Sequence, residues 1–232
     1  PLLRVRDEIS RAGLVLITAD KGLAGSYNHN IIQAAWRFVR ALSYPVEIVA
    51  VGKRGRDAMW RLKQNIVAEF TDVPAQPRIL DVSPIAHTVI DAFVSGHYDV
   101  VYVAFTDFIN TLKQEPAIWQ LLPLHALRGA VSAPMSEFRS VQAAESTVEY
   151  IYEPDPRTIL DTVLPRFTEL QIYHAILESM ASEHSARMVA MKNATDNAQQ
   201  IIKDLTLEYN KMRQASITNE LLEISTAQMA LR

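Results

Sequence analysis

Two short stretches of this sequence combine residue types that could take part in chemistry. The first is Asp20-Lys21-Gly22-Leu23-Ala24-Gly25, which lies between an expected strand and an expected helix. A glycine turn in that position can present backbone N–H groups to a phosphate. The stretch contains neither G-x-G-x-x-G nor G-x-x-x-x-G-K-[ST], however. We therefore interpret its glycines as permitting a tight turn and close helix–sheet packing, and we expect no bound cofactor.

The second stretch is Ser182-Glu183-His184-Ser185, which contains the types of a nucleophile, a base and an acid. Adjacent positions of a helix point in different directions, so these side chains do not form a triad. His174 and His184 are ten residues apart, nearly three helical turns, and cannot share a metal ion. No pair of carboxylates suits acid–base catalysis. The sequence therefore predicts no catalytic, cofactor-binding or metal-binding residue.

The element that carries these histidines has the pattern of one very long helix. Residues 167–232 contain no glycine and no proline. Apolar residues recur there at alternating steps of three and four, which is typical of a helix that supercoils on a partner. Such a helix would be on the order of 100 Å long, more than the core of a domain this size could cover. The positions in these steps, which we call the seam, are Leu160, Val163, Phe167, Leu170, His174, Leu177, Ala181, His184, Met188, Met191, Thr195, Ala198, Ile202, Leu205, Tyr209 and Met212.

The two histidines in the seam are interpreted as polar interruptions that help to set the register of a coiled coil. Asp155-Pro156 supplies an N-cap and a first-turn proline for the helix, and Pro165 predicts a kink or a restart. We therefore divide the chain into a base domain, residues 1–155, and a long C-terminal coiled-coil helix, residues 156–232.

The base domain alternates strands with helices, which predicts a mostly parallel sheet covered on both faces. The expected fold is thus α/β, with a Rossmann-like domain followed by the long helix. After residue 105 the pattern changes to further strands at 118–123 and 146–153, with an irregular loop at 124–146 between them. The earlier strands are expected at 13–18, 46–51, 66–70 and 99–105, and the helices at 30–42, 52–63 and 84–95.

Composition excludes several classes of protein. The net charge of -3 argues against a general nucleic-acid binder, which usually carries a basic excess. No apolar run approaches the roughly 20 residues that cross a bilayer. With no cysteine, the chain has no disulfide and no thiolate chemistry.

The end of the long helix places polar groups beside apolar ones. Arg213, Gln214, Thr218 and Glu220 lie close to Ile217, Leu221 and Leu222. One reading is an ordinary solvated face beside a buried one. The other is a tip that sits inside other subunits and forms a few specific hydrogen bonds, since arginine can bind a carboxylate through two charge-assisted bonds. Composition alone does not choose between them.

Three segments resemble the gamma subunit of F-type ATP synthases. They begin Ala181-Ser182-Glu183-His184-Ser185-Ala186-Arg187-Met188, Tyr209-Asn210-Lys211-Met212-Arg213-Gln214-Ala215-Ser216 and Ile17-Thr18-Ala19-Asp20-Lys21-Gly22-Leu23-Ala24-Gly25. The resemblance covers the chain from end to end. It implies a non-catalytic central stalk, in which a Rossmann-like base carries a coiled coil that enters a hexamer of alpha and beta subunits. Rotation of a membrane ring of c subunits, driven by protons, would turn the stalk and couple proton flow to ATP synthesis or hydrolysis.

The resemblance also assigns roles to residues and partners. The partners it implies are the alpha, beta and epsilon subunits, the c ring and the subunit's own N-terminal helix. It implies a peripheral membrane protein on the cytoplasmic face of the bacterial inner membrane, or the equivalent face of an organelle membrane. The residues implied to contact the beta subunit are Arg213, Gln214, Thr218 and Glu220, the apolar tip in the hexamer bearing is Ile217, Leu221 and Leu222, and the coiled-coil seam includes Leu177, Met188, Met191, Ile202, Leu205, Tyr209 and Met212.

The sequence departs from the family in three ways. We interpret the family's N-terminal helix as absent from this sequence, because Pro1-Leu2-Leu3 corresponds to the segment that the resemblance places just before the first strand. The usual glycine before the final alanines is missing from residues 223–232. The cysteine-bearing regulatory insert of chloroplast relatives has no counterpart, which excludes thiol regulation here.

Two other functions remain open. The chain could be a non-rotary structural adaptor that dimerises through residues 160–212, which sedimentation would reveal. A nucleotide-dependent enzyme is the third possibility, and tight binding of ATP or NAD would support it.

Overall fold

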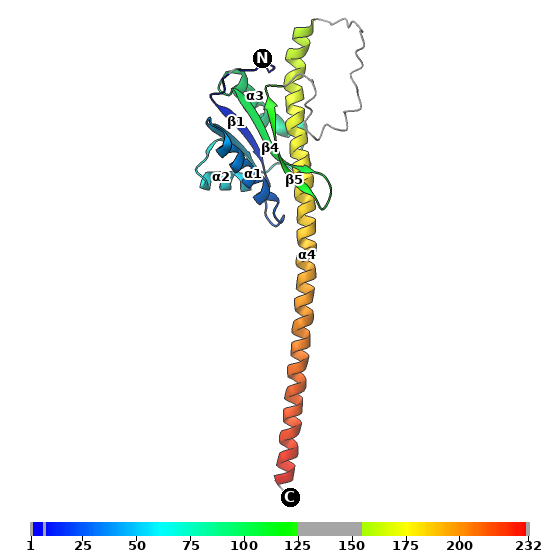
Figure 1. The fold of residues 1–232 in the computed structure, drawn as a ribbon. Coiled ribbons are helices and arrows are strands. Elements are labelled where there is room, and N and C mark those ends of the chain that lie inside the picture. The colour runs from blue at the N-terminus through cyan, green and yellow to red at the C-terminus, as the bar shows by residue number, and fades with distance from the viewer. Residues whose placement is uncertain (1, 7, 125–154, 231–232) are drawn as a thin grey trace. The chain divides into compact units, whose positions relative to one another are not determined.

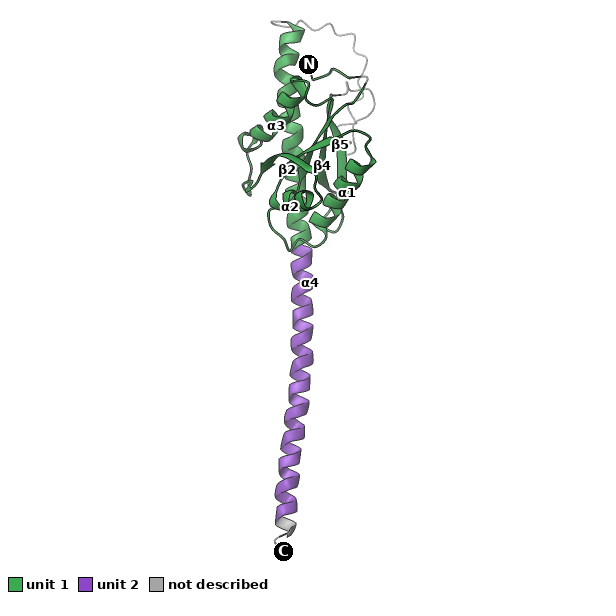
Figure 2. Ribbon diagram, turned by 90° about the vertical axis from the view of Figure 1, so that its left-hand side faces the viewer, with its two compact units in different colours: residues 1–187 green, residues 188–232 purple. Residues whose placement is uncertain are grey.

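The computed structural model describes residues 2–6, 8–124 and 155–230. Its contacts divide the chain into two compact units, residues 1–187 and residues 188–232 (Figure 2). The first unit contains a sheet with its covering helices, and the second consists of helix. The predicted strand at 146–153 and all but the first residue of the predicted loop at 124–146 lie outside the described residues.

The sheet has five strands in the order β3-β2-β1-β4-β5. The first four strands are parallel to one another, and β5 is antiparallel to β4. This arrangement confirms the predicted mostly parallel α/β fold. The strands are β1 (Ala12–Ile17), β2 (Val46–Val51), β3 (Asn65–Phe70), β4 (Val100–Phe108) and β5 (Gln114–Leu122).

Helices cover both faces of the sheet (Figure 1). All six residues of β1 are buried, because the strand lies in the middle of the sheet. Leu14 and Leu16 pack in the core under α1 (Tyr27–Ala41) and α2 (Lys53–Arg61). Val15 and Ile17 pack on the opposite face, under α3 (Ile79–Val94) and the first part of α4 (Pro156–Ala230). This even burial explains why β1 reads as a continuous apolar run.

Helix α3 begins five residues earlier than predicted. It starts at Ile79 and includes Pro84, which the sequence analysis placed at the helix start. The carboxylate of Asp81 accepts a hydrogen bond from the backbone N–H of Arg78 at 2.7 Å and so stabilises the true first turn. Pro84 has no backbone N–H, so the carbonyl of Leu80 lacks its usual donor within the helix. Leu80 is exposed, so water can donate to that carbonyl instead.

Strands β4 and β5 form a hairpin that the sequence analysis did not recognise. The prediction ended β4 at Phe105 and began β5 at Ile118, but both strands are longer. Asn110 closes the turn by exchanging backbone hydrogen bonds with Lys113 at 3.0 and 3.2 Å. Pro116 is accommodated because β5 is an edge strand.

Helix α4 begins at Pro156, as predicted. Asp155 caps it by accepting hydrogen bonds from the backbone of Arg157 and Thr158 at 2.9 and 3.0 Å. The helix continues through Pro165, so the predicted restart is wrong. The alternative, a kink at Pro165, stays a prediction. Asp161, whose carbonyl loses its donor there, is exposed to water. None of the described helices is both long enough and apolar enough to cross a membrane.

Candidate helix-pairing surface and tip

Within the first unit, one face of α4 packs against the sheet and α3. Ile172, Ala175 and Ile176 are fully buried in the core on that side. Glu169 is also buried, and Arg166 donates to its carboxylate at 2.9 Å. A hydrogen bond from Ser83 on α3 lowers the pKa of Glu169, and the ion pair with Arg166 lowers it further. We call this side of α4 the docked face. Its residues also recur at steps of three and four, but each lies about two positions from a seam residue. Two positions are about 200° around a helix, so the docked face and the seam are on opposite sides.

Serines extend this docked face to the end of the first unit. β1 pairs with β4 only as far as Ala104, so Thr106 has no strand beside it on that edge. Ser179 Oγ accepts a hydrogen bond from the Thr106 N–H at 3.1 Å, and Ser182 Oγ donates to the Thr106 carbonyl at 3.2 Å. Ser185 Oγ donates to the Thr111 carbonyl at 2.9 Å. Ser179 and Ser182 therefore take the place of a neighbouring strand beside Thr106.

Loss of one of these bonds should destabilise the fold. We expect Ser182→Ala to lower the free energy of unfolding by about 1–2 kcal/mol, because the Thr106 carbonyl is left without its partner in a buried position. Urea unfolding followed by circular dichroism measures the change. Ser216→Ala, at an exposed position of the same helix, is the control and should change stability by less than about 0.5 kcal/mol.

The serine-containing stretch and the glycine turn, which the sequence analysis singled out separately, meet in space. Tyr27 is buried beside Ser179, and burial raises the pKa of its phenol. Ala186 packs on the same small cluster as Tyr27. Arg187 pairs with Glu183 and donates to the Gly22 carbonyl at 3.4 Å. As predicted, Ser182, Glu183 and His184 do not converge: Ser182 is buried against β4, whereas His184 is exposed.

The first turn of α2 is filled by a carboxylate of the chain itself. Asp20 accepts a hydrogen bond from the N–H of Lys53 at 3.0 Å and from the N–H of Asp72 at 3.0 Å. The backbone N–H of Lys53, at the N-terminus of α2 where an anion could otherwise bind, is thus already satisfied by Asp20. Gly25 has a φ of +55°, which the turn requires. The close approach of helix to sheet is made by Gly52 and Gly55, which lie against Thr18.

A carboxyl group on α4 gives this interface a pH dependence. Glu178 Oε2 is buried and has no hydrogen-bond partner among the described residues. Burial, with the charge of Asp107 on β4, raises the pKa of Glu178 to about 7. Burial and the charge of Glu115 on β5 raise the pKa of Asp107 as well. The folded chain therefore favours a protonated Glu178.

The stability that this proton provides is complete below the ordinary glutamate pKa and is lost as the pH rises through about 7. We expect Glu178→Gln to leave the free energy of unfolding unchanged at pH 4.5. At pH 8 the variant should have a higher free energy of unfolding than the unmodified chain. The difference should be about 1 kcal/mol, after allowance for partial exposure. Urea unfolding at several pH values measures this difference. The control Glu208→Gln, at an exposed site, should have the same stability as the unmodified chain at each pH.

The seam lies on the face opposite to the docked one. In the first unit Leu160, Val163 and Leu170 are exposed, whereas Leu177 is partly buried. In the second unit the large apolar residues of the seam range from 39% exposed at Met191 to 67% exposed at Met212. The exposed members of the predicted set there are Met188, Met191, Ile202, Leu205, Tyr209 and Met212. A partner for this face remains a prediction.

The tip residues are all exposed and all helical. Arg213 and Glu220 are two turns apart on one face with Ile217 between them, and the other predicted residues extend round about half of the helix. Thr218 Oγ1 donates to the Gln214 carbonyl at 2.8 Å, and Glu220 accepts from Ser216 at 3.3 Å. Ile217, Leu221 and Leu222 are between 46% and 61% exposed. No described residue pairs with the Arg213 guanidinium, so it is free for an external acceptor.

Comparisons with known proteins agree with one another. A family model described as ATP synthase matches residues 1–231. The ATP synthase gamma chain of Roseiflexus castenholzii is 48% identical over 233 residues, covering 99% of this chain and 76% of that protein. The gamma chain of Chloroflexus aurantiacus is 42% identical over 233 residues, with the same coverage of both chains.

Solved structures share the fold. A chain in the central stalk and c-ring of the Tetrahymena thermophila mitochondrial ATP synthase superposes with a TM-score of 0.62 at 24% identity, covering 83% of this chain and 80% of that one. A chain in the rotor of the Euglena gracilis enzyme superposes with a TM-score of 0.62 at 19% identity, covering 90% of this chain and 75% of that one. At these identities the likeness concerns the fold of the chain.

Proposed function

Because this chain belongs to the ATP synthase gamma chain family, we propose that it is the central-stalk rotor subunit of a proton-translocating F-type ATP synthase. In this role it couples rotation of a membrane ring to ATP synthesis or hydrolysis at the beta subunits and is itself non-catalytic. The observation that carries the proposal beyond family membership is the exposed seam of α4. A shaft of two paired helices resists torsion better than a single helix. The exposed apolar residues of the seam have the heptad spacing with which such a second helix would pair.

The proposed partner of the seam is an N-terminal helix of the same subunit, preceding residue 1. Apolar side chains at heptad spacing would interlock with it, and each well-buried leucine or methionine would contribute about 1.5–3 kcal/mol. Two interlocked helices are stiffer than one, which suits the transmission of torque. The base domain, residues 1–155, and the coiled-coil helix, residues 156–232, would then be the functional divisions of the chain.

The proposed partners beyond the chain are the alpha and beta subunits, the epsilon subunit and the c ring, at the cytoplasmic face of a bacterial inner membrane. Arg213, Gln214, Thr218 and Glu220 are proposed to contact the beta subunit, and Ile217, Leu221 and Leu222 to form the apolar tip. The free guanidinium of Arg213 and the exposure of the apolar tip support this assignment.

Substitution at the tip tests the function. We expect Arg213→Ala and Gln214→Ala each to lower the rate of coupled ATP synthesis in the reconstituted enzyme by about tenfold, because each removes a specific hydrogen bond. Assembly should be unaffected, since both residues are exposed in the folded chain. Lys203→Ala and Gln199→Ala, at exposed positions about three and four turns earlier, are the matched controls and should leave synthesis unchanged.

An unchanged rate in both tip variants would remove these residues from the contact. Sedimentation of the purified chain separates the rotor from a structural adaptor. A rotor should bind hexamers of alpha and beta subunits in one copy, whereas a stable dimer through residues 160–212 would favour the adaptor.

A further inference from the structure

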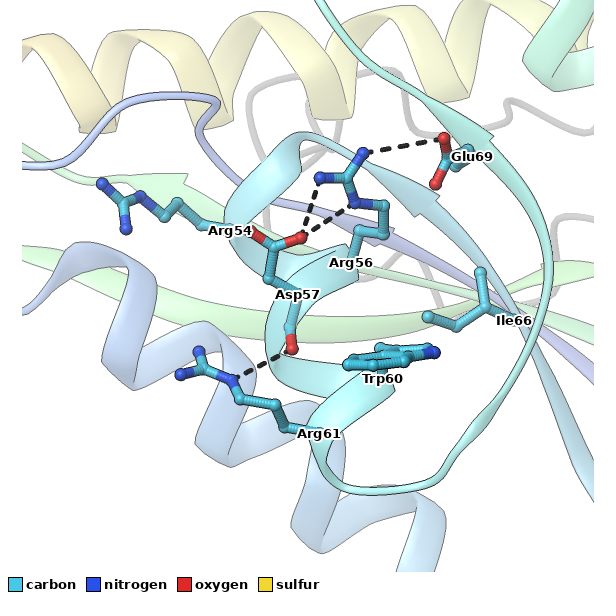
Figure 3. Close-up of a pocket in the computed structure, with 7 residues that line it drawn as sticks. All are labelled: Arg54, Arg56, Asp57, Trp60, Arg61, Ile66 and Glu69. Carbon is cyan, nitrogen blue, oxygen red and sulfur yellow. Dashed lines mark hydrogen bonds and ion pairs between the residues drawn. The ribbon is translucent and has the colours of Figure 1, made fainter.

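The base domain carries a second surface that the proposed rotor function does not use. It is an open groove of about 670 Å³ between α2 and the edge strand β3 (Figure 3). We call it the α2–β3 groove. Its lining combines three arginines, an aromatic ring, an aliphatic side chain and two carboxylates, namely Arg54, Arg56, Asp57, Trp60, Arg61, Ile66 and Glu69.

The groove has a surplus of positive charge. Arg56 donates to Asp57 at 2.8 and 2.9 Å and lies 3.6 Å from Glu69, so this one guanidinium engages both carboxylates. Arg61 uses only its Nε, which donates to the Asp57 carbonyl at 3.1 Å. No described residue forms a hydrogen bond or ion pair with the Arg54 side chain. Two exposed guanidiniums therefore remain available to a ligand.

The largest apolar side chain of the groove is mostly exposed to solvent. Trp60 is 75% exposed and lies beside Ile66 (Figure 3). The other two tryptophans have partners: Trp119 packs edge-on against Phe105 at 4.4 Å, and Arg40 lies over Trp36 at 5.0 Å. An exposed tryptophan in a groove that is also lined by arginines has the composition of an interface centre.

The backbone beside the groove is also available. β3 pairs with β2 along one edge, and no described strand pairs with its other edge. An unpaired edge strand can accept an extended segment from another chain. A strand added there would direct alternate side chains to the face of the sheet on which Ile66 lies beside Trp60 (Figure 3).

We propose that the α2–β3 groove binds an acidic, extended segment of a neighbouring subunit, an inference that rests on the proposed function because that function supplies the neighbours. Arg54 and Arg61 are two turns apart on α2, about 10 Å along its axis, so they bind carboxylates roughly three positions apart in an extended chain. Trp60 and Ile66 pack against an apolar side chain of the same segment. Asp57 and Glu69 oppose the concentrated charge of a phosphate, which disfavours a nucleotide or nucleic acid.

Photo-crosslinking in the assembled enzyme tests this assignment. Trp60 is replaced by p-benzoylphenylalanine, the complex is purified and irradiated, and the joined peptide is identified by mass spectrometry. The expected product joins this position to a segment of another subunit that carries at least two carboxylates. The same replacement at Trp36, on α1, is the control and should not produce that product.

Removal of the charges completes the test. With the crosslinker in place, Arg54→Gln together with Arg61→Gln should lower the yield of the acidic product by at least about tenfold. Arg37→Gln together with Arg40→Gln, an exposed arginine pair on α1, should leave it unchanged.

The inference is overturned if an assembled, coupled enzyme shows no product at Trp60, a product with lipid or with a segment lacking carboxylates, or a yield that does not depend on the two arginines. In those cases the proposed rotor function stands. If the unmodified chain does not assemble with the other subunits, the proposed function fails and this inference fails with it.

Discussion

Leu205→Asp should abolish coupled ATP synthesis while leaving the isolated chain as stable as before. Leu205 is 59% exposed on the seam of α4, so the aspartate remains hydrated in the isolated chain and costs little more than its lower helix propensity. In the proposed shaft the same position is covered by a second helix. A carboxylate buried there without a partner would cost about 3–5 kcal/mol and would also remove the packing of the leucine.

The neighbouring residue Leu207 offers a matched control. It is 57% exposed, but it lies two positions away and therefore on the opposite side of the helix from Leu205. If only the seam is paired, Leu207→Asp should retain at least half of the coupled synthesis rate. The rates are measured in membranes that contain equal amounts of assembled enzyme. Equal loss in both variants would contradict a single pairing face, and normal synthesis in Leu205→Asp would remove the shaft from the proposed mechanism.

Much of this fold follows from the pattern of the sequence. The apolar run at β1 and the alternation of strands with helices predict a parallel sheet, because each strand of that sheet must be buried on both faces. The long helix follows from its seam and from the capping residue Asp155. The β4–β5 hairpin was missed because its turn, at Asn110, has no glycine and because Pro116 interrupts the strand pattern.

The docked face of α4 was harder to predict than its seam. Ser179, Ser182 and Ser185 follow helical spacing, but small polar residues give no apolar signal. Their role depends on where β1 ends beside β4, which is a property of the assembled sheet. The small residues on the side of the helix opposite the apolar seam were the only signal in the sequence that could have indicated this docked face. The roles of the tip residues came from family resemblance alone, because an exposed polar helix end looks the same with or without a partner.

Gly52→Ala should destabilise the base domain by about 4 kcal/mol, the largest loss expected from any single added methyl group here. Gly52 links β2 to α2 with a φ of +95°, where residues with a side chain are strained. A Cβ built there lies 2.1 Å from the carbonyl oxygen of Thr18. That oxygen cannot retreat easily, because Thr18 is tied by its N–H to the Val51 carbonyl at 2.8 Å and by its hydroxyl to the Gly55 N–H at 2.8 Å.

Gly25→Ala separates the effect of the collision from that of the backbone angle. Gly25 also has a positive φ, of +55°, but nothing lies within 4 Å of its added Cβ. The alanine there should cost only the 1–2 kcal/mol of a left-handed conformation. Thermal unfolding should therefore show a loss of about 10 °C for Gly52→Ala and a much smaller loss for Gly25→Ala. Similar losses at both sites would mean that β1 and α2 can separate easily, and that Thr18 does not hold them together.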